Sequence, residues 1–161
     1  MRYPVTLTVN GRELRREVEA RVLLLDLLRE DLGVTSARAG CETSSCGACT
    51  VILDGRAVKS CTRLAVQADG SSVLTVEGLR EGEAPDPLED ALLARFAVGC
   101  GFCVPATIVA ARDLLRDAPE PSRDDIVRGL EGILCRCTGH RRRVDAIAVA
   151  ARALRGEEGS G

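Results

Sequence analysis

Eight cysteines in 161 residues form two groups of four, and cysteine thiolates are the usual ligands of iron–sulfur clusters and of structural zinc. The first group has the spacing Cys41-x4-Cys46-x2-Cys49 and is completed by Cys61. The second group consists of the pairs Cys100-x2-Cys103 and Cys135-x-Cys137. No cysteine is left over, and the chain has one histidine and no phosphate- or nucleotide-binding motif. The chemistry that these residues predict is the transfer of single electrons by two clusters.

The spacing of the first group is that of a plant-type [2Fe–2S] cluster. Three thiols within nine residues must wrap one small cluster, so the segment has to be an irregular loop, and Gly40 and Gly47 allow its backbone to pass close to the sulfides. Backbone N–H groups of such a loop can point at the sulfurs. Zinc is the alternative, but it prefers separate C-x2-C pairs.

The spacing of the second group distinguishes less clearly between zinc and an iron–sulfur cluster. Zinc sites usually present two C-x2-C pairs, whereas here one pair is C-x-C, and zinc stays open as an alternative. The segment CGFC lies where a helix begins, and CRC lies in a loop that leads into another helix. Helix N-termini there favour an anionic centre, so we expect a second cluster.

The overall composition limits the partners and the compartment. The chain has 22 basic and 24 acidic residues, a net charge of −2, and nothing in it predicts nucleic-acid binding. It has no apolar run long enough to form a transmembrane segment and no signal sequence. We therefore expect a cytoplasmic protein, whose reducing surroundings disfavour disulfides and leave the thiols for metal.

The first half of the chain is expected to form a small mixed sheet with one crossing helix. Apolar and polar residues alternate through Val5–Val9, and Asn10-Gly11 and Asp54-Gly55 are hairpin signals. The segment 22–31 predicts a short apolar helix, with Gly33 at its end.

The second half changes to helical periodicity, which predicts an antiparallel bundle of four helices. Leu88, Leu92 and Phe96 are expected to share one helix face, and Ser122 with Asp125 forms a capping box. The predicted fold class is α+β. The predicted domains are a ferredoxin-like domain at 1–79, a linker at 80–87, a four-helix domain at 88–155 and a disordered tail at 156–161.

The cysteine motifs together resemble those of the small iron–sulfur subunit of the molybdenum hydroxylases, the xanthine oxidase family. The matching segments are GCETSSCGACTV (40–51), KSCT (59–62), CGFC (100–103) and LCRCTGH (134–140), and the likeness extends over about residues 3–155. The stretch from Gly40 to Leu79 is especially similar to the small subunit of aerobic carbon monoxide dehydrogenases.

The resemblance implies a β-grasp ferredoxin-like domain followed by a four-helix bundle, each with one [2Fe–2S] cluster. Cys41, Cys46, Cys49 and Cys61 would hold the distal cluster, and Cys100, Cys103, Cys135 and Cys137 the proximal one. The chain would relay electrons from a molybdenum–pterin cofactor on a large subunit to FAD on a medium subunit, in a dimer of heterotrimers. No residue of this chain would be catalytic.

Several positions depart from the family pattern, and all of them lie near the second group. The family usually has Gln, Asn and Tyr where this chain has Gly99, Ile133 and His140, and it has other residues at Val104 and Ala106. These changes leave the thiols intact, but they affect the expected contact with the pterin and the cluster potential.

The sequence is also compatible with other functions, and a few further residues could contribute to them. The alternatives are the small subunit of an aldehyde or N-heterocycle dehydrogenase, a zinc-stapled interaction module and a free-standing ferredoxin, which would not need the second half. His140 is expected to be an ordinary helix-entry residue, Arg136 a solvated or charge-offsetting one, and Arg141 to Arg143 either a solvated helix end or a docking patch.

Overall fold

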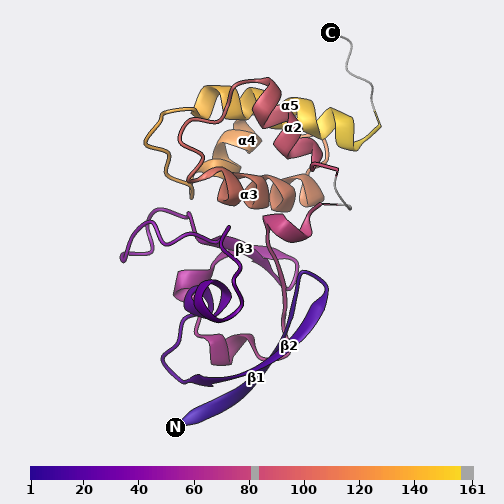
Figure 1. Ribbon diagram of the computed structural model, residues 1–161. Helices are drawn as coiled ribbons and strands as arrows, with labels where there is room; N and C mark the ends of the chain where they lie inside the picture. Colours follow the sequence, from indigo (N-terminus) through magenta and orange to yellow (C-terminus); the bar gives the residue numbers. More distant parts are fainter. Residues whose placement is uncertain (81–83, 157–161) are drawn as a thin grey trace.

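The computed structural model describes residues 1–80 and 84–156, and it confirms the α+β class. A strand-rich half formed by the first part of the chain lies beneath a helical half formed by the second part (Figure 1). Residues 81–83 of the predicted linker, and 157–161 of the predicted tail, are outside the described residues. No helix in the described part of the chain is long and apolar enough to cross a membrane.

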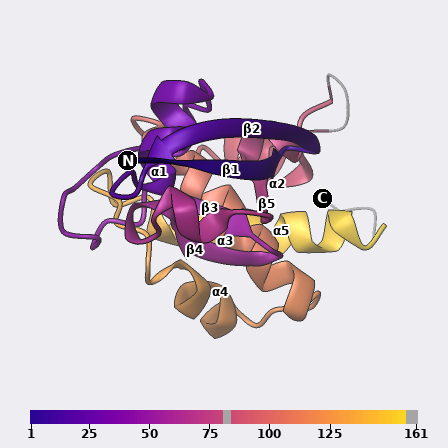
Figure 2. The same cartoon turned by 90° about the horizontal axis from the view of Figure 1, so that it is seen from below.

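The strands of the described residues form one five-stranded sheet with the order β2-β1-β5-β3-β4. The strands are β1 (Arg2–Val9), β2 (Arg12–Glu19), β3 (Thr50–Leu53), β4 (Arg56–Lys59) and β5 (Ser72–Leu74). Only the β1–β5 pair is parallel, so the sheet is mixed as predicted. Seen from below, the strands lie side by side across the molecule (Figure 2).

Two tight turns set the register of the hairpins. Asn10 and Gly11 have φ values of 50° and 78°, and Asp54 and Gly55 have φ values of 49° and 82°. Both central residues of each turn are therefore in the left-handed region. This is the two-residue turn whose twist matches that of the flanking strands. The predicted hairpin signals are confirmed.

One short helix covers the sheet. It begins as α1 (Leu24–Asp26), continues as a π-helical turn over Leu27–Asp31, and is followed by Gly33 at φ 68°. Its leucines are buried against β1, β3 and β5. This core includes Val5, Leu7, Val9, Leu24, Leu27, Leu28, Val51 and Val73.

The helical half consists of α2 (Pro87–Ala94), α3 (Val104–Asp117), α4 (Arg123–Leu130) and α5 (His140–Leu154). Among the described residues, the core of the helical half is separate from the core of the strand-rich half. This core includes Leu88, Leu92, Ile108, Leu115, Ile126, Leu130, Val144 and Ile147. The predicted capping box is confirmed, since Ser122 accepts from the Asp125 N–H at 3.1 Å.

Phe96 does not belong to the core, and its predicted place on the helix face of Leu88 and Leu92 is wrong. The helix ends at Ala94, where Phe96 N–H bonds to Leu93 O (3.0 Å) and Ala97 N–H to Leu92 O (2.9 Å). This is the Schellman pattern, which needs a left-handed residue at the position of Phe96. Phe96 accordingly has φ 50° and a side chain that is 79% exposed.

The two halves pack through α3, which lies on β3 (Figure 1). Arg56 of β4 forms an exposed ion pair with Asp117 at the end of α3, at 2.5 Å. Arg38 reaches from the strand-rich half to donate to Gly101 O at 2.9 Å and to stack 5.4 Å from the Phe102 ring. The loops that carry the cysteines meet at this same junction.

Candidate metal centres

All eight cysteines lie in the described part of the chain and are free thiols. Cys41, Cys46 and Cys49 occupy the loop before β3, and Cys61 lies in a short 3-10 turn, Ser60–Thr62, after β4. The hairpin between them folds Cys61 back onto the loop. Cys49 and Cys103 are buried, Cys41, Cys46, Cys61 and Cys135 are half-buried, and Cys100 and Cys137 are exposed.

Backbone N–H groups point at the sulfurs of the first group. Cys46 N–H approaches Cys41 Sγ at 3.5 Å, and Ala48 N–H approaches Cys46 Sγ at the same distance. The N–H of Cys46 is the main reason why the pKa of the Cys41 thiol is lowered to about 6. Such donors stabilise thiolate, which is the form that binds metal.

The fourth thiol of the first group is held by its neighbours in the turn. The Ser60 hydroxyl and N–H both donate to Cys49 O, at 2.8 and 3.3 Å. Cys61 Sγ lies 3.7 Å from the hydroxyl of Ser44, which belongs to the loop itself. Burial raises the pKa of the Cys49 thiol; the Cys61 N–H opposes this rise, whereas the Cys61 thiol adds to it. The structure therefore brings the first group together.

The second group is brought together by α3, α5 and the segments before them. Cys100 N–H donates to Cys137 Sγ at 3.4 Å, which joins the two pairs. Burial raises the pKa of the Cys103 thiol. Burial also opposes ionisation of Cys135, but the Gly139 N–H and other neighbours outweigh it and lower that pKa. The N–H of Phe102 is the main cause of a lowered pKa at Cys100.

Glycines line both groups, although not all for the predicted reason. A Cβ on Gly40 would lie 3.0 Å from Cys46 Sγ, so this glycine does allow close passage to a sulfur. A Cβ on Gly47 would instead lie 2.0 Å from the carbonyl oxygen of Gly132, in the other cysteine loop. Gly99, noted as a departure, lies directly against Cys137: a Cβ there would be 2.9 Å from its Sγ.

The two groups share one hollow of about 550 Å³. Its lining includes Cys46 of the first group and Cys100, Cys103 and Cys135 of the second, with Arg136 and His140 at its wall. The N–H of Leu134, the residue before Cys135, donates to Cys46 O at 2.9 Å. The sequence pattern did not predict this bond between the two loops.

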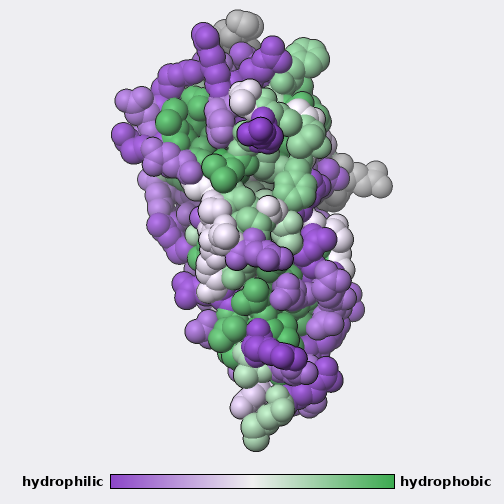
Figure 3. Space-filling model, turned by 90° about the vertical axis from the view of Figure 1, so that its left-hand side faces the viewer, coloured by the Kyte–Doolittle hydropathy of each residue, from purple (hydrophilic) through white to green (hydrophobic). Residues whose placement is uncertain are grey.

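The side of the molecule toward which both loops project carries apolar surface (Figure 3). Among the exposed large hydrophobic side chains of the helical half, Phe102 and Leu134 line the hollow that the two groups share. A second hollow, of about 410 Å³, lies beside Cys137 and is bordered by Phe96, Gly99, Arg141 and Arg142.

Arg143 differs from the other two arginines of its run, which was expected to be either a solvated helix end or a docking patch. Arg141 and Arg142 are exposed, whereas Arg143 is 2% exposed and donates to Cys103 Sγ at 3.1 Å. Of the other departures from the family pattern, Ala106 and Ile133 are buried and Val104 begins α3. His140 is the first residue of α5, as expected for a helix-entry residue.

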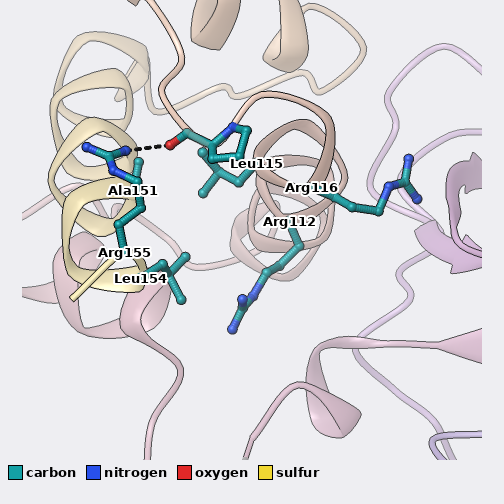
Figure 4. A pocket seen from close by; sticks show the side chains of 7 residues that line it. Arg112, Leu115, Arg116, Ala151, Leu154 and Arg155 are labelled. Carbon is teal, nitrogen blue, oxygen red and sulfur yellow. Dashed lines mark hydrogen bonds between the residues drawn. The ribbon is translucent and has the colours of Figure 1, made fainter.

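A further hollow, between α3 and the end of α5, lies apart from the cysteines (Figure 4). Three arginines border it, but carboxylates engage each of them. Arg112 pairs with Asp86, Arg116 with Asp113 and Asp117, and Arg155 with Glu120. The hollow therefore has no excess positive charge that would favour an anion.

The donor set fits a [2Fe–2S] cluster in each group. Four free thiols, N–H groups at sulfur and glycines at close approaches suit an anionic iron–sulfide centre. Among the described residues, no three His, Cys, Asp or Glu side chains are grouped so as to hold a single metal ion. A binuclear cluster does not require such a group, because each iron takes two thiolates.

Comparisons with known proteins agree with this chemistry. Residues 75–148 match the family model described as a [2Fe-2S] binding domain. The chain is 43% identical over 146 residues to the nicotine 6-hydroxylase small subunit of Paenarthrobacter nicotinovorans, an alignment that covers 91% of this chain and 88% of that protein. It is 42% identical over 155 residues to the aldehyde oxidoreductase of Megalodesulfovibrio gigas, covering 94% of this chain and 17% of that longer protein.

Solved structures show the same likeness in three dimensions. A chain in the crystal structure of quinoline 2-oxidoreductase from Pseudomonas putida 86 is 44% identical and superposes with a TM-score of 0.90. The match covers 97% of this chain and 98% of that one.

Proposed function

Because the chain belongs to the [2Fe–2S] small subunits of the molybdenum hydroxylase family, we propose that it relays single electrons from a molybdenum–pterin site on a large subunit to FAD on a medium subunit. Relatives of this family are subunits of oxidoreductase complexes. Each [2Fe–2S] cluster, when bound, supplies one-electron chemistry. The chain provides no catalytic residue in this proposal, and its contribution is to hold, space and tune the two clusters.

The proposed ligands are the two groups of thiols. Cys41, Cys46, Cys49 and Cys61 would hold the distal cluster, toward the flavin, and Cys100, Cys103, Cys135 and Cys137 the proximal one, toward the pterin. The free state of all eight thiols and the N–H groups directed at their sulfurs support this assignment.

The proposed domains are a β-grasp [2Fe–2S] ferredoxin-like domain at 1–79 and a four-helix [2Fe–2S] domain at 88–155. The separate cores of the sheet and of the helices support this division. The helix α2 begins at Pro87, inside the range proposed as the linker, 80–87.

The observation that carries the proposal is the junction between the two loops. Cys46 and Cys135 border one hollow, and the Leu134 N–H to Cys46 O bond connects the backbone beside one thiol to that of the other. This bond lies on a short route of covalent and hydrogen bonds between the groups. A relay needs such proximity, whereas two zinc staples in an interaction module do not.

The proposed substrate class of the complete enzyme is an N-heterocycle. Two of the relatives described above are named for nicotine and quinoline. An aldehyde dehydrogenase and an enzyme of the carbon monoxide dehydrogenase type are the alternatives, the first because of the likeness to an aldehyde oxidoreductase. The proposed assembly is a dimer of heterotrimers. Activity of the purified complex on nicotine or quinoline would support the N-heterocycle class, and activity on aldehydes or carbon monoxide alone would contradict it.

Iron analysis with electron paramagnetic resonance (EPR) tests the relay. We expect about four iron per chain and two separate signals after dithionite reduction. The variant C61S should lose the signal of the first group, and C135S should lose the signal of the second. In each variant, the signal of the unchanged group is the control. Zinc without iron, or one signal that both variants abolish, would contradict the proposal.

A further inference from the structure

Arg143 is a buried cation beside one of the candidate clusters. It lies in the first turn of α5, and it is the largest of the fully buried side chains among the described residues. Its neighbours Arg141 and Arg142 on the same turn are exposed. Burying a guanidinium is costly unless a counter-charge and hydrogen bonds compensate for its lost hydration.

The contacts of Arg143 direct it at a thiol. Nη2 donates to Cys103 Sγ at 3.1 Å, Nη1 to Thr107 Oγ1 at 3.3 Å and Nε to Ala97 O at 3.4 Å. Thr107 is itself fixed, because its hydroxyl donates to Cys103 O at 2.9 Å. Two neutral oxygens therefore hold the guanidinium while one of its N–H groups faces the sulfur.

None of the ion pairs among the described residues includes Arg143. Its other buried partners, Ala97 O and Thr107 Oγ1, carry no net charge. Cys103, whose Sγ it contacts at 3.1 Å, belongs to the group of four thiols that can supply negative charge. The thiolates of the second group are thus the natural counter-charge of this cation.

We propose that Arg143 is the internal counter-charge of the cluster held by the second group and that it raises the reduction potential of that cluster. This inference rests on the function proposed above. Two ferric ions, two sulfides and four thiolates sum to a net charge of two minus, and reduction adds one electron to make it three minus. The guanidinium keeps its proton, and no bond forms or breaks. A buried cation stabilises the more negative, reduced state.

The test is a redox titration of the full chain, with the subunits that purify with it, followed by EPR. The variant R143M removes the charge and keeps an unbranched side chain, R143K keeps the charge, and R142M is the matched control on the exposed side of the same turn. We expect R143M to lower the reduction equilibrium constant of the second cluster at least tenfold, which is 59 mV for one electron. R143K should stay close to the wild type, and R142M should shift the constant less than twofold because water screens its charge.

The cluster of the first group provides an internal reference, and its potential should not move in any of these variants. An R143M potential that stays within the shift of R142M would overturn the inference. If R143M does not retain the second cluster, R143K and R143Q are compared instead. A potential of that cluster that is lower in R143Q than in R143K supports the counter-charge, and equal potentials in the two variants contradict it. If the wild type lacks both signals, the proposed relay itself fails, whereas two wild-type signals without the R143M shift refute only the role of Arg143.

Discussion

At the scale of single residues, the junction between the two cysteine loops depends on a glycine. Gly47 has φ 70°, and a Cβ on it would lie 2.0 Å from Gly132 O. An L-residue at Gly47 therefore meets two separate costs, one from the left-handed backbone and one from the contact with the opposite loop.

We expect G47A to lower the free energy of unfolding by about 2–5 kcal/mol, the sum of a left-handed alanine and an overpacked contact. The matched control is G70A, because Gly70 has φ 76° but nothing within 4 Å of its Cβ position. This control should lose only about 1–2 kcal/mol. Chemical denaturation of the cluster-loaded variants measures both, and equal losses would show that the loop contact does not matter.

At the scale of elements, the ends of α2 show how a helix is delimited in this protein. Its start is capped by Asp86, which accepts from Leu88 N–H at 2.8 Å and pairs with Arg112 of α3 while its own side chain is fully buried. Its end is the Schellman turn, in which Phe96 takes a left-handed conformation. One end is therefore strongly stabilised, and the other is strained.

Replacing Phe96 by glycine should stabilise the helix end. Phe96 is 79% exposed, so F96G sacrifices little packing and removes the cost of a left-handed L-residue, for a gain of about 1 kcal/mol in unfolding free energy. The control is L93G, since Leu93 is also exposed but lies inside the helix, where glycine costs about 1 kcal/mol. Thermal unfolding should thus shift in opposite directions for the two variants, and a destabilised F96G would contradict this account.

The buried pair of Asp86 and Arg112 should matter far more than an exposed pair. Breaking a buried ion pair from one side costs about 3–5 kcal/mol, and we expect D86A to lose an amount in this range. The comparison is D145A, which breaks the exposed pair of Arg123 and Asp145 and should lose less than about 1 kcal/mol. Similar losses in urea denaturation would mean that Asp86 adds nothing beyond a surface charge.

At the scale of the whole molecule, the sheet and the helices have separate cores and meet at α3 and at the cysteine loops. Two arginines of the strand-rich half cross this junction in different ways. Arg38 is half-buried, donates to Gly101 O and stacks on Phe102, whereas Arg56 forms an exposed pair with Asp117. We therefore expect the contact of Arg38 to order the loops and the exposed pair of Arg56 to add little.

Hydrogen exchange at the Leu134 amide, whose N–H bonds to Cys46 O, reports on this junction. We expect R38A to speed its exchange about tenfold or more, because the loss of a partly buried cation–π contact and a hydrogen bond to a charged group weakens the junction by about 1.5 kcal/mol or more. R56A should change the exchange less than about fivefold. If both variants leave the Leu134 amide equally protected, Arg38 does not order the loops.

Much about this protein follows from local sequence alone. The spacing of the eight cysteines indicates two metal-binding groups, and the turn pairs Asn10-Gly11 and Asp54-Gly55 predict the observed hairpins. The capping box at Ser122 and the periodicity around it predict α4. These features are readable because their interactions join residues close in sequence, where spacing and residue type are sufficient.

Only the tertiary structure decided how these parts meet. The bond between Leu134 and Cys46, the contact of Gly47 with Gly132 and the burial of Arg143 against Cys103 each join residues that are at least forty positions apart. Arg143 follows two exposed arginines in the sequence, and nothing in that run distinguishes it from them. Long-range contacts leave no periodic pattern in a sequence, because burial of a side chain depends on which distant segment packs over it.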